Sequence, residues 1–322
     1  MRYAVLPLLL CAAALAQAAA PEPYPTKPVR LLVGFPPGGA VDVTARTLAS
    51  PLGERLKQQV VVDNRGGAHG NIAAETVARA TPDGHTLLLG TISILAINPA
   101  LYKNIPFDSM RDFAPISILV GVSNIVVAHP SLGVNTMNEL IALAKAKPGA
   151  LSFATSGTGS PGHLAGELLK TLAGINMLHV PYKGGGPAMS DLLGGQVNTM
   201  FATVSTAVPH IKSGKLRGLA VTSGRRAAVL PEVPTIAEAT PYRGYEANNW
   251  YGMVAPAKTP PHIIKRLNSE LHASLARTEV RERLLGQGLE AQPSTPAEFS
   301  TYLQREIGKW AKVVKDANAR VE

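Results

Sequence analysis

Apolar runs of strand length alternate with stretches of helical character from residue 29 onward. The runs at 29–35, 59–64 and 85–92 are nearly uninterrupted, which is typical of strands buried on both faces. Residues 41–57 and 71–80, which lie between these runs, are expected to be helical. This alternation predicts an α/β fold in which helices flank mostly parallel sheets.

The same alternation continues through the middle of the chain. Further strands are expected at 114–120, 124–128, 151–155, 177–181, 197–204, 216–222 and 245–254. Helices are expected at 137–146, 161–172, 187–193 and 207–212. Thr136 and Glu139 have the spacing of a capping box at the start of one of these helices. The C-terminal segments 260–276 and 296–317 each carry one apolar stripe, as amphipathic helices do.

The first residues have the pattern of an export signal. Arg2 supplies a positive charge, residues 6–16 are apolar, and 16–18 form a small-x-small cleavage site. We expect cleavage after Ala18 and a soluble mature protein in the periplasm, because the apolar stretch is shorter than the roughly 20 residues that span a bilayer. A lipid anchor at Cys11 is the alternative, but Leu10 stands where a lipobox has a small residue.

Composition fits two domains with substantial cores. The chain has 322 residues, of which 46% are apolar and 16% charged. Lys and Arg number 31 against 22 Asp and Glu, so the formal charge is +9 and favours an anionic partner. The basic residues are scattered and only 5% of residues are aromatic, so we expect no nucleic-acid binding.

Several chemistries lack the residues they need. Cys11 is the only cysteine, so removal of the signal leaves no thiol for a disulfide or a nucleophile. The eight histidines show no ligand spacing such as His-Glu-x-x-His, and no Walker-type loop is present. The sequence therefore predicts neither a metal site nor a cofactor.

The first candidate binding loop follows the strand at 29–35. Two prolines stiffen it, and Gly38 and Gly39 permit close approach to its backbone. The loop opens a helix, whose free N-terminal amides and positive dipole favour an anion. Asp42 falls in the first turn, where it either caps the helix or accepts a bond from a ligand or water.

The second candidate loop, 156–163, also lies between a strand and a helix. Ser160 is a good N-cap and Pro161 suits the first helical position. Its glycines match the dinucleotide pattern Gly-x-Gly-x-x-Gly, but the next strand presents His179 where a ribose-binding acid is needed. We interpret the loop as a carboxylate cradle. A third turn of the same kind, 182–187, contributes an aromatic ring and a lysine.

A hydrolase is the main alternative. Ser160 and His163 are close enough in sequence to form a nucleophile and base, as in a secreted esterase or amidase. Thr158 stands where the nucleophile elbow Gly-x-Ser-x-Gly has glycine, and no third orienting group is evident. A histidine bonded to backbone or packed on a neighbouring strand is the more ordinary role for His163.

Ordered matches along nearly the whole mature chain resemble the Bug-type periplasmic solute receptors of tripartite tricarboxylate transporters. The matching segments are 24–28, 35–39 with Asp42, 61–65, 67–68, 70–72, 82–84, 112–113, 156–160, 163–164, 182–184, Trp250 and 255–256. His69 and Gly66 depart from the usual glycine and proline, respectively.

The resemblance implies a two-lobed periplasmic-binding-protein, or Venus-flytrap, architecture without catalysis. One lobe is expected to be discontinuous, from 27–123 and 250–322, and the other to comprise 124–249. A small carboxylate held between the loops is then delivered to a membrane permease, and we expect a monomer. A ligand-dependent signalling receptor shares the same cleft and stays an alternative.

The expected ligand contacts come from both loops, the third turn and neighbouring strand ends. They are Phe35, Gly38, Gly39, Ala40, Asp42, Thr91, Ser93, Ser156, Gly157, Thr158, Gly159, Ser160, Tyr182, Lys183 and Thr203.

Overall fold

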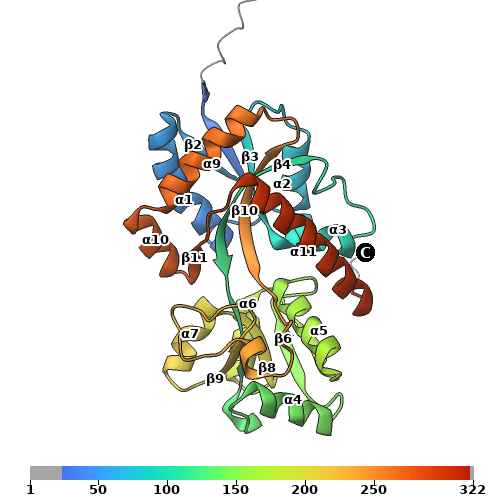
Figure 1. Ribbon diagram of the computed structural model, residues 1–322. Helices are drawn as coiled ribbons and strands as arrows, with labels where there is room; N and C mark the ends of the chain where they lie inside the picture. The colour runs from blue at the N-terminus through green and yellow to red at the C-terminus, as the bar shows by residue number, and fades with distance from the viewer. Residues whose placement is uncertain (1–23, 320–322) are drawn as a thin grey trace, which may run out of the picture.

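The computed structural model describes residues 24–319, which form two sheets in two lobes, each flanked by helices (Figure 1). The α/β prediction is confirmed. The predicted export signal at 1–18 lies outside the described residues. Within 24–319, no helix is both long and apolar enough to cross a membrane.

The first lobe is built on a six-stranded sheet of order β11-β4-β10-β3-β1-β2. Its strands are β1 (Val29–Val33), β2 (Val60–Asn64), β3 (Thr86–Thr91), β4 (Phe113–Val122), β10 (Asn249–Pro256) and β11 (Leu289–Ala291). Its helical segments are α1 (Ala40–Leu56), η1 (Ala68–Gly70), α2 (Asn71–Ala78), η2 (Ser93–Ile97), α3 (Asn98–Leu101), α9 (Pro261–Leu275), α10 (Thr278–Leu285) and α11 (Pro296–Asp316).

The second lobe is built on a five-stranded sheet of order β7-β6-β8-β5-β9. Its strands are β5 (Asn124–Ala128), β6 (Ser152–Thr155), β7 (Leu178–Pro181), β8 (Thr199–Thr203) and β9 (Arg217–Val221). Its helical segments are η3 (Pro130–Leu132), α4 (Met137–Ala146), α5 (Pro161–Ala173), α6 (Gly185–Leu193), α7 (Val204–Lys212) and α8 (Ile236–Ala239).

Burial on both faces explains the uninterrupted apolar runs. In β1, Leu31 and Val33 pack into the cluster that contains α1 and α9, whereas Leu32 points to the opposite cluster, which contains α2 and α11. Strand β3 divides in the same way, with Leu87 on one side and Leu88 on the other. Because successive side chains of a strand face opposite ways, a sheet covered on both faces needs apolar residues at every position.

The prediction of mostly parallel sheets is wrong: both sheets are mixed, because the segments that pass between the lobes add antiparallel pairs. Strand β1 is parallel to β2 and β3, but β10 is antiparallel to both β3 and β4. In the second sheet β6 is parallel to β7 and β8, whereas β5 is antiparallel to β8 and β9. The chain leaves the first lobe through β4 and returns through β10, so these two strands must run in opposite directions (Figure 1).

The two passages between the lobes lie side by side. Ser123 alone separates β4 from β5, and Asn249, where β10 begins, pairs with Val122 at the end of β4. On the second-lobe side, Thr222 joins both passages, because its N–H donates to Asn124 O at 2.9 Å and its carbonyl accepts from Ala247 N at 2.8 Å. Two adjacent, hydrogen-bonded segments of this kind form a natural hinge.

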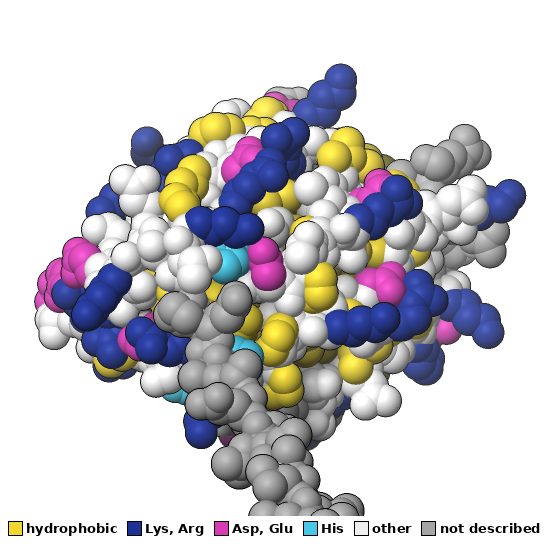
Figure 2. Space-filling model, turned by 90° about the horizontal axis from the view of Figure 1, so that it is seen from above, with side chains coloured by type: hydrophobic (Ala, Val, Ile, Leu, Met, Phe, Trp, Pro, Cys, Tyr) yellow, Lys and Arg dark blue, Asp and Glu magenta, His cyan; other side chains and the backbone are white. Residues whose placement is uncertain are grey.

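Charged side chains are dispersed over the top of the first lobe. Figure 2 shows Lys and Arg spread across this face, with Asp and Glu among them. Ion pairs of the first lobe include Lys27 with Asp83 at 3.2 Å and Arg266 with Glu270 at 3.0 Å. The visible charge on this face is therefore mixed rather than gathered in one stripe.

Candidate functional site

A cavity of about 630 Å³ lies between the lobes, where the two candidate loops face each other. The first lobe contributes the β1–α1 loop, the end of β3 and the α10–β11 loop, and the second contributes Ser156 and the starts of α5, α6 and α7. Among the described residues that line it, none is Lys, Arg, Asp or Glu. Attraction for a charged ligand must therefore come from backbone and neutral polar groups.

The starts of four helices converge on this cleft. Gly39 and Ala40 lie at the start of α1, Pro161 and Gly162 at that of α5, Gly185 and Gly186 at that of α6, and Ser205 and Thr206 at that of α7. Each helix N-terminus presents unpaired amides and about half a positive charge. Their convergence makes the cleft a site for an anion.

The start of α1 is left open toward the cleft. Gly39 is the N-cap and has no side chain to satisfy the helix amides. Val43 donates the first intrahelical bond, to Gly39 O at 2.9 Å, so the amides of Ala40, Val41 and Asp42 have no acceptor within the helix. A carboxylate of a bound molecule would satisfy these donors.

Asp42 is turned toward its own loop. Its carboxylate is 3% exposed, accepts the Gly38 N–H at 2.9 Å, and is bonded to Arg46 and Asn64. Burial acts to raise the pKa of Asp42, but the bonds from Arg46, Gly38 and Asn64 outweigh it and hold the pKa below its usual range. The positive charge of Arg46 offsets a negative charge that would otherwise repel an anion at this helix start.

The second loop satisfies most of its own amides. Gly157 N–H donates to Thr155 Oγ1 at 3.3 Å, Ser160 N–H donates to Gly157 O at 3.2 Å, and Gly159 N–H donates to His163 Nδ1 at 3.1 Å. Ser160 caps α5 as predicted, since its Oγ accepts the His163 N–H at 3.2 Å. The loop is therefore a preformed wall of the cleft rather than a row of free donors.

His163 occupies the ordinary role expected of it. Its ring stacks on His179 with centroids 3.9 Å apart, while His179 Nε2 lies 2.7 Å from Thr155 Oγ1. Burial first, and then the neighbouring His179 and Lys170, lower the pKa of His163 to about 3. The ring nitrogen that faces the loop accepts from Gly159, and Ser160 Oγ bonds the backbone of His163, so this geometry gives no serine–imidazole pair.

The third turn contributes glycines to the cleft rather than its charged side chain. Tyr182 donates its hydroxyl to Asp191 Oδ2 at 2.6 Å, and this bond, with burial, raises the pKa of Tyr182 to about 12. Lys183 is exposed and does not line the cleft, whereas Gly185 and Gly186 do.

The structure brings about half of the predicted contacts to the cleft. Those that line it are Phe35, Gly38, Gly39, Ala40, Thr91, Ser93, Ser156 and Thr203. Those outside its lining are Asp42, Gly157, Thr158, Gly159, Ser160, Tyr182 and Lys183. Polar lining residues that the sequence analysis missed are Asn124, Ser205, Thr206, Asn249, Tyr251 and Gln287.

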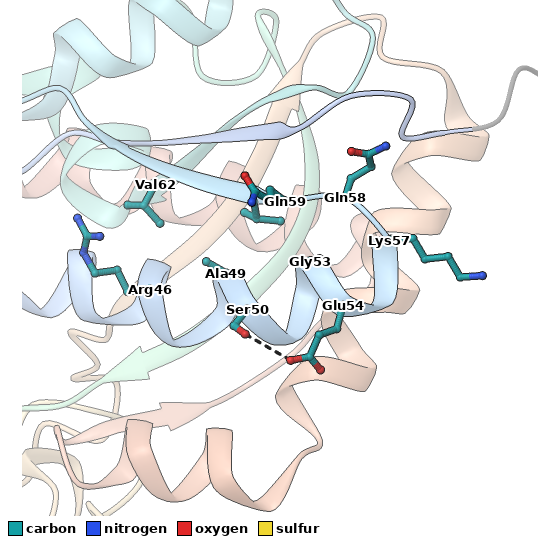
Figure 3. Close-up of a pocket in the computed structure, with 10 residues that line it drawn as sticks. Arg46, Ala49, Ser50, Gly53, Glu54, Lys57, Gln58, Gln59 and Val62 are labelled. Carbon is teal, nitrogen blue, oxygen red and sulfur yellow. Dashed lines mark hydrogen bonds between the residues drawn. The ribbon is translucent and has the colours of Figure 1, made fainter.

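Two other cavities do not involve the loop glycines. One of them, of about 790 Å³, is an open groove between α1 and the edge strand β2 (Figure 3). It is bordered by side chains such as Lys57 and by Ser50, which bonds Glu54 at 3.3 Å. Another, of about 380 Å³, lies beside the hinge and is lined by Ser123 and Trp250, among others. Helix starts converge only on the interlobe cleft among the cavities described.

Comparisons with known proteins agree with the architecture. A family model described as "Tripartite tricarboxylate transporter family receptor" matches residues 44–319. Protein BugT of Bordetella pertussis is 39% identical over 322 residues, covering 99% of this chain and 98% of BugT.

Two solved structures match over almost their whole length. The R. palustris protein Rpa4515, solved with adipate, is 37% identical with a TM-score of 0.79, covering 92% of this chain and 98% of that chain. MatC from Rhodopseudomonas palustris, solved with bound malate, is 31% identical with a TM-score of 0.75, covering 90% and 100%. These matches confirm the predicted two-lobed fold class.

Proposed function

The chain belongs to the tripartite tricarboxylate transporter receptor family, and from this premise we propose that it captures a small carboxylate in its interlobe cleft and delivers it to a membrane permease. Members of this family are transport receptors, so the chain is a solute receptor rather than an enzyme, as predicted. The resemblance found in the sequence is confirmed.

The observation that carries the proposal is the convergence of helix starts from both lobes on one cavity without charged side chains. The free amides of α1 belong to the first lobe, and the starts of α5, α6 and α7 belong to the second. The cavity of about 630 Å³ lies within the range typical of small-molecule sites. Adipate and malate in two relatives support a carboxylate as the ligand class.

Binding to both lobes at once supplies the reason for closure. A ligand shifts an open–closed equilibrium only by its difference in affinity for the two states. A carboxylate bonded to α1 on one side and to the second lobe on the other gains contacts only when the hinge closes. The proposal therefore includes hinge closure around the ligand, with lobes at 27–123 with 250–322 and at 124–249.

The cellular setting belongs to the same proposal. An exported receptor in the periplasm, acting as a monomer, presents its ligand to the permease, and the resemblance to Bug-type receptors supports this route. Predicted ligand contacts such as Gly39, Ala40 and Ser156 line the cleft, which supports the proposal that a carboxylate binds there.

Titration calorimetry with a panel of mono-, di- and tricarboxylates that includes adipate and malate tests the proposal. We expect heat and a raised melting temperature with at least one acid, and neither with the matched diamide, which lacks the charge. An absence of heat and of thermal shift with every acid would contradict carboxylate capture.

A further inference from the structure

The two loops of the cleft are held by the same arrangement. In the first, Gly38 N–H donates to Asp42 Oδ2 at 2.9 Å, and in the second, Gly159 N–H donates to His163 Nδ1 at 3.1 Å. In both, the donor is a glycine and the acceptor lies four residues later, in the first turn of the helix that the loop opens. Gly38 and Gly159 have φ of +87° and +76°, in the left-handed region that favours glycine.

We propose that Asp42 and His163 are matched positioning residues, each of which fixes its ligand loop by accepting the amide of the glycine four residues before it. The proposal rests on the proposed function, because it concerns how the carboxylate site is kept in shape. Neither side chain lines the cleft, so each acts through its loop rather than on the ligand.

Burial makes these bonds effective constraints. Asp42 is 3% exposed and His163 is 6% exposed, so water does not readily replace either acceptor. The Gly159 amide is itself buried, so the loss of its acceptor would leave an unsatisfied buried donor, which is destabilising, whereas the Gly38 bond is part-buried. Each bond therefore holds its loop backbone in one conformation, and the remaining helix-start amides stay directed at the cleft.

His163 does this only as a neutral ring with its proton on Nε2. An accepting Nδ1 needs a free lone pair, which a protonated imidazole lacks. The charged and titratable groups that face the ring are His179, stacked on it, Glu167 Oε1, 3.9 Å from Nε2, and Lys170, bonded to Glu167 at 2.8 Å. Burial of His163 and His179 first, and then the nearby positive charge of Lys170, disfavour protonation of either ring and hold both pKa values below their usual range.

The stacked partner extends the support to the other end of the loop. His179 Nε2 lies 2.7 Å from Thr155 Oγ1, and Thr155 Oγ1 in turn accepts from Gly157 N–H at 3.3 Å. The two imidazoles thus join α5, β6 and β7 to both glycines of the loop. These contacts connect His163, through His179 and Thr155, to the loop backbone at both glycines, which supports a role for His163 in positioning the loop.

Two substitutions of His163 separate positioning from simple packing. In His163→Asn, Oδ1 stands near the place of Nδ1 and still accepts the Gly159 amide, whereas His163→Leu fills the space without an acceptor. His129→Leu is the matched control, because His129 Nδ1 also accepts a backbone amide, that of Ser131 at 3.3 Å, at a site away from the cleft.

The first measurement is hydrogen exchange of the unliganded protein, read at the amides of residues 157–160. We expect slow exchange in the wild type, His163→Asn and His129→Leu, and at least tenfold faster exchange in His163→Leu. Unchanged exchange in His163→Leu, or equally fast exchange in His163→Asn, would overturn the proposal.

The second measurement is the Kd for whichever acid of the adipate and malate panel gives the most heat with the wild type. We expect at least a tenfold rise in His163→Leu and less than a threefold change in His163→Asn and His129→Leu. If the wild type gives no heat, the proposed function fails, whereas the exchange result still decides the positioning role.

Discussion

An N-cap carboxylate introduced at Gly39 should stabilise the protein and abolish ligand binding at the same time. Gly39 has φ −79° and ψ 166°, an extended conformation open to any residue, and an added Cβ meets nothing nearer than Pro36 O at 3.8 Å. Gly39→Asp therefore places a carboxylate over the amides that the open start of α1 leaves without acceptors. The substitution mimics the ligand from within the chain.

The two effects differ in size as well as in sign. A capping side chain in place of glycine contributes a few tenths of a kcal/mol, and a negative charge at a helix N-terminus adds about 0.3–1 kcal/mol. The free energy of unfolding should rise by about 0.5–1.5 kcal/mol. Two carboxylates about 4 Å apart repel by about 4 kcal/mol at an effective dielectric constant of about 20, so the ligand Kd should rise at least hundredfold.

Denaturant unfolding and titration calorimetry on the same preparations measure both effects. Gly39→Asn is the control, since it caps the helix without charge and should gain stability with a smaller loss of affinity. A Gly39→Asp variant that binds the acid as the wild type does would refute the idea that the start of α1 receives the carboxylate.

Three further outcomes follow from the second loop. The pKa of His163 is about 3 in the fold against about 6.5 unfolded, so the unfolded chain binds more protons below about pH 6.5. His163 therefore lowers stability as pH falls, by about 2 kcal/mol at pH 5, and denaturant unfolding should show a loss smaller by about this amount in His163→Asn, in which His179 still contributes its own loss. Ser160→Ala should lower the free energy of unfolding by about 1 kcal/mol, because it removes the side-chain cap of α5. It should not change the background hydrolysis of activated esters. A hydrolysis rate that depends on Ser160 would restore the esterase hypothesis. A Cβ at Gly159 would lie 2.3 Å from Leu101 Cδ2 of the first lobe, so Gly159→Ala should weaken ligand binding in calorimetry. Adding Leu101→Ala to this variant should recover part of the lost affinity. If no affinity is recovered, the clash with Leu101 is not the cause of the loss.

Local sequence patterns predict the strands that are uninterrupted apolar runs and the helices that begin at a good N-cap residue. The uninterrupted run at Val29–Val33, the Thr136 cap of α4 and the Ser160–Pro161 start of α5 all appear as expected. In α4, however, Glu139 bonds the Asn135 amide instead of closing the capping box on Thr136. Which of several neighbouring amides the Glu139 carboxylate accepts depends on the local turn, and the sequence spacing of Thr136 and Glu139 alone does not determine it.

Helix α7 begins three residues earlier than the sequence pattern predicts, because propensity and context disagree. The residues from Thr203 to Thr206 include three β-branched side chains and favour a strand, so the pattern predicts a helix only from residue 207. The helix begins at Val204, whose N–H donates to Ser123 O at 3.0 Å across the hinge. A hydrogen bond between residues far apart in sequence thus accompanies one of the helix starts that face the cleft.

The contribution of the C-terminal segment to the cleft leaves no local sequence signal, for a different reason. Helix α10 buries only Val280 and Leu284, too weak an apolar stripe to identify it, and β11 is three residues long. Gln287 and Leu289 reach the cleft because β11 pairs with β4 next to the hinge. The position of β11 depends on its pairing with β4, which is far away in sequence, and local sequence patterns do not predict such pairing.

The central claim is that one ligand carboxylate is held by the open start of α1 while the second lobe closes on it. A crystal structure of the protein with the acid that gives the most heat tests this most directly. The account predicts a carboxylate oxygen about 2.7–3.2 Å from the amide nitrogens of Ala40 and Val41, with further bonds from the second lobe. A bound acid that leaves these amides without contact, or that touches one lobe only, would contradict it.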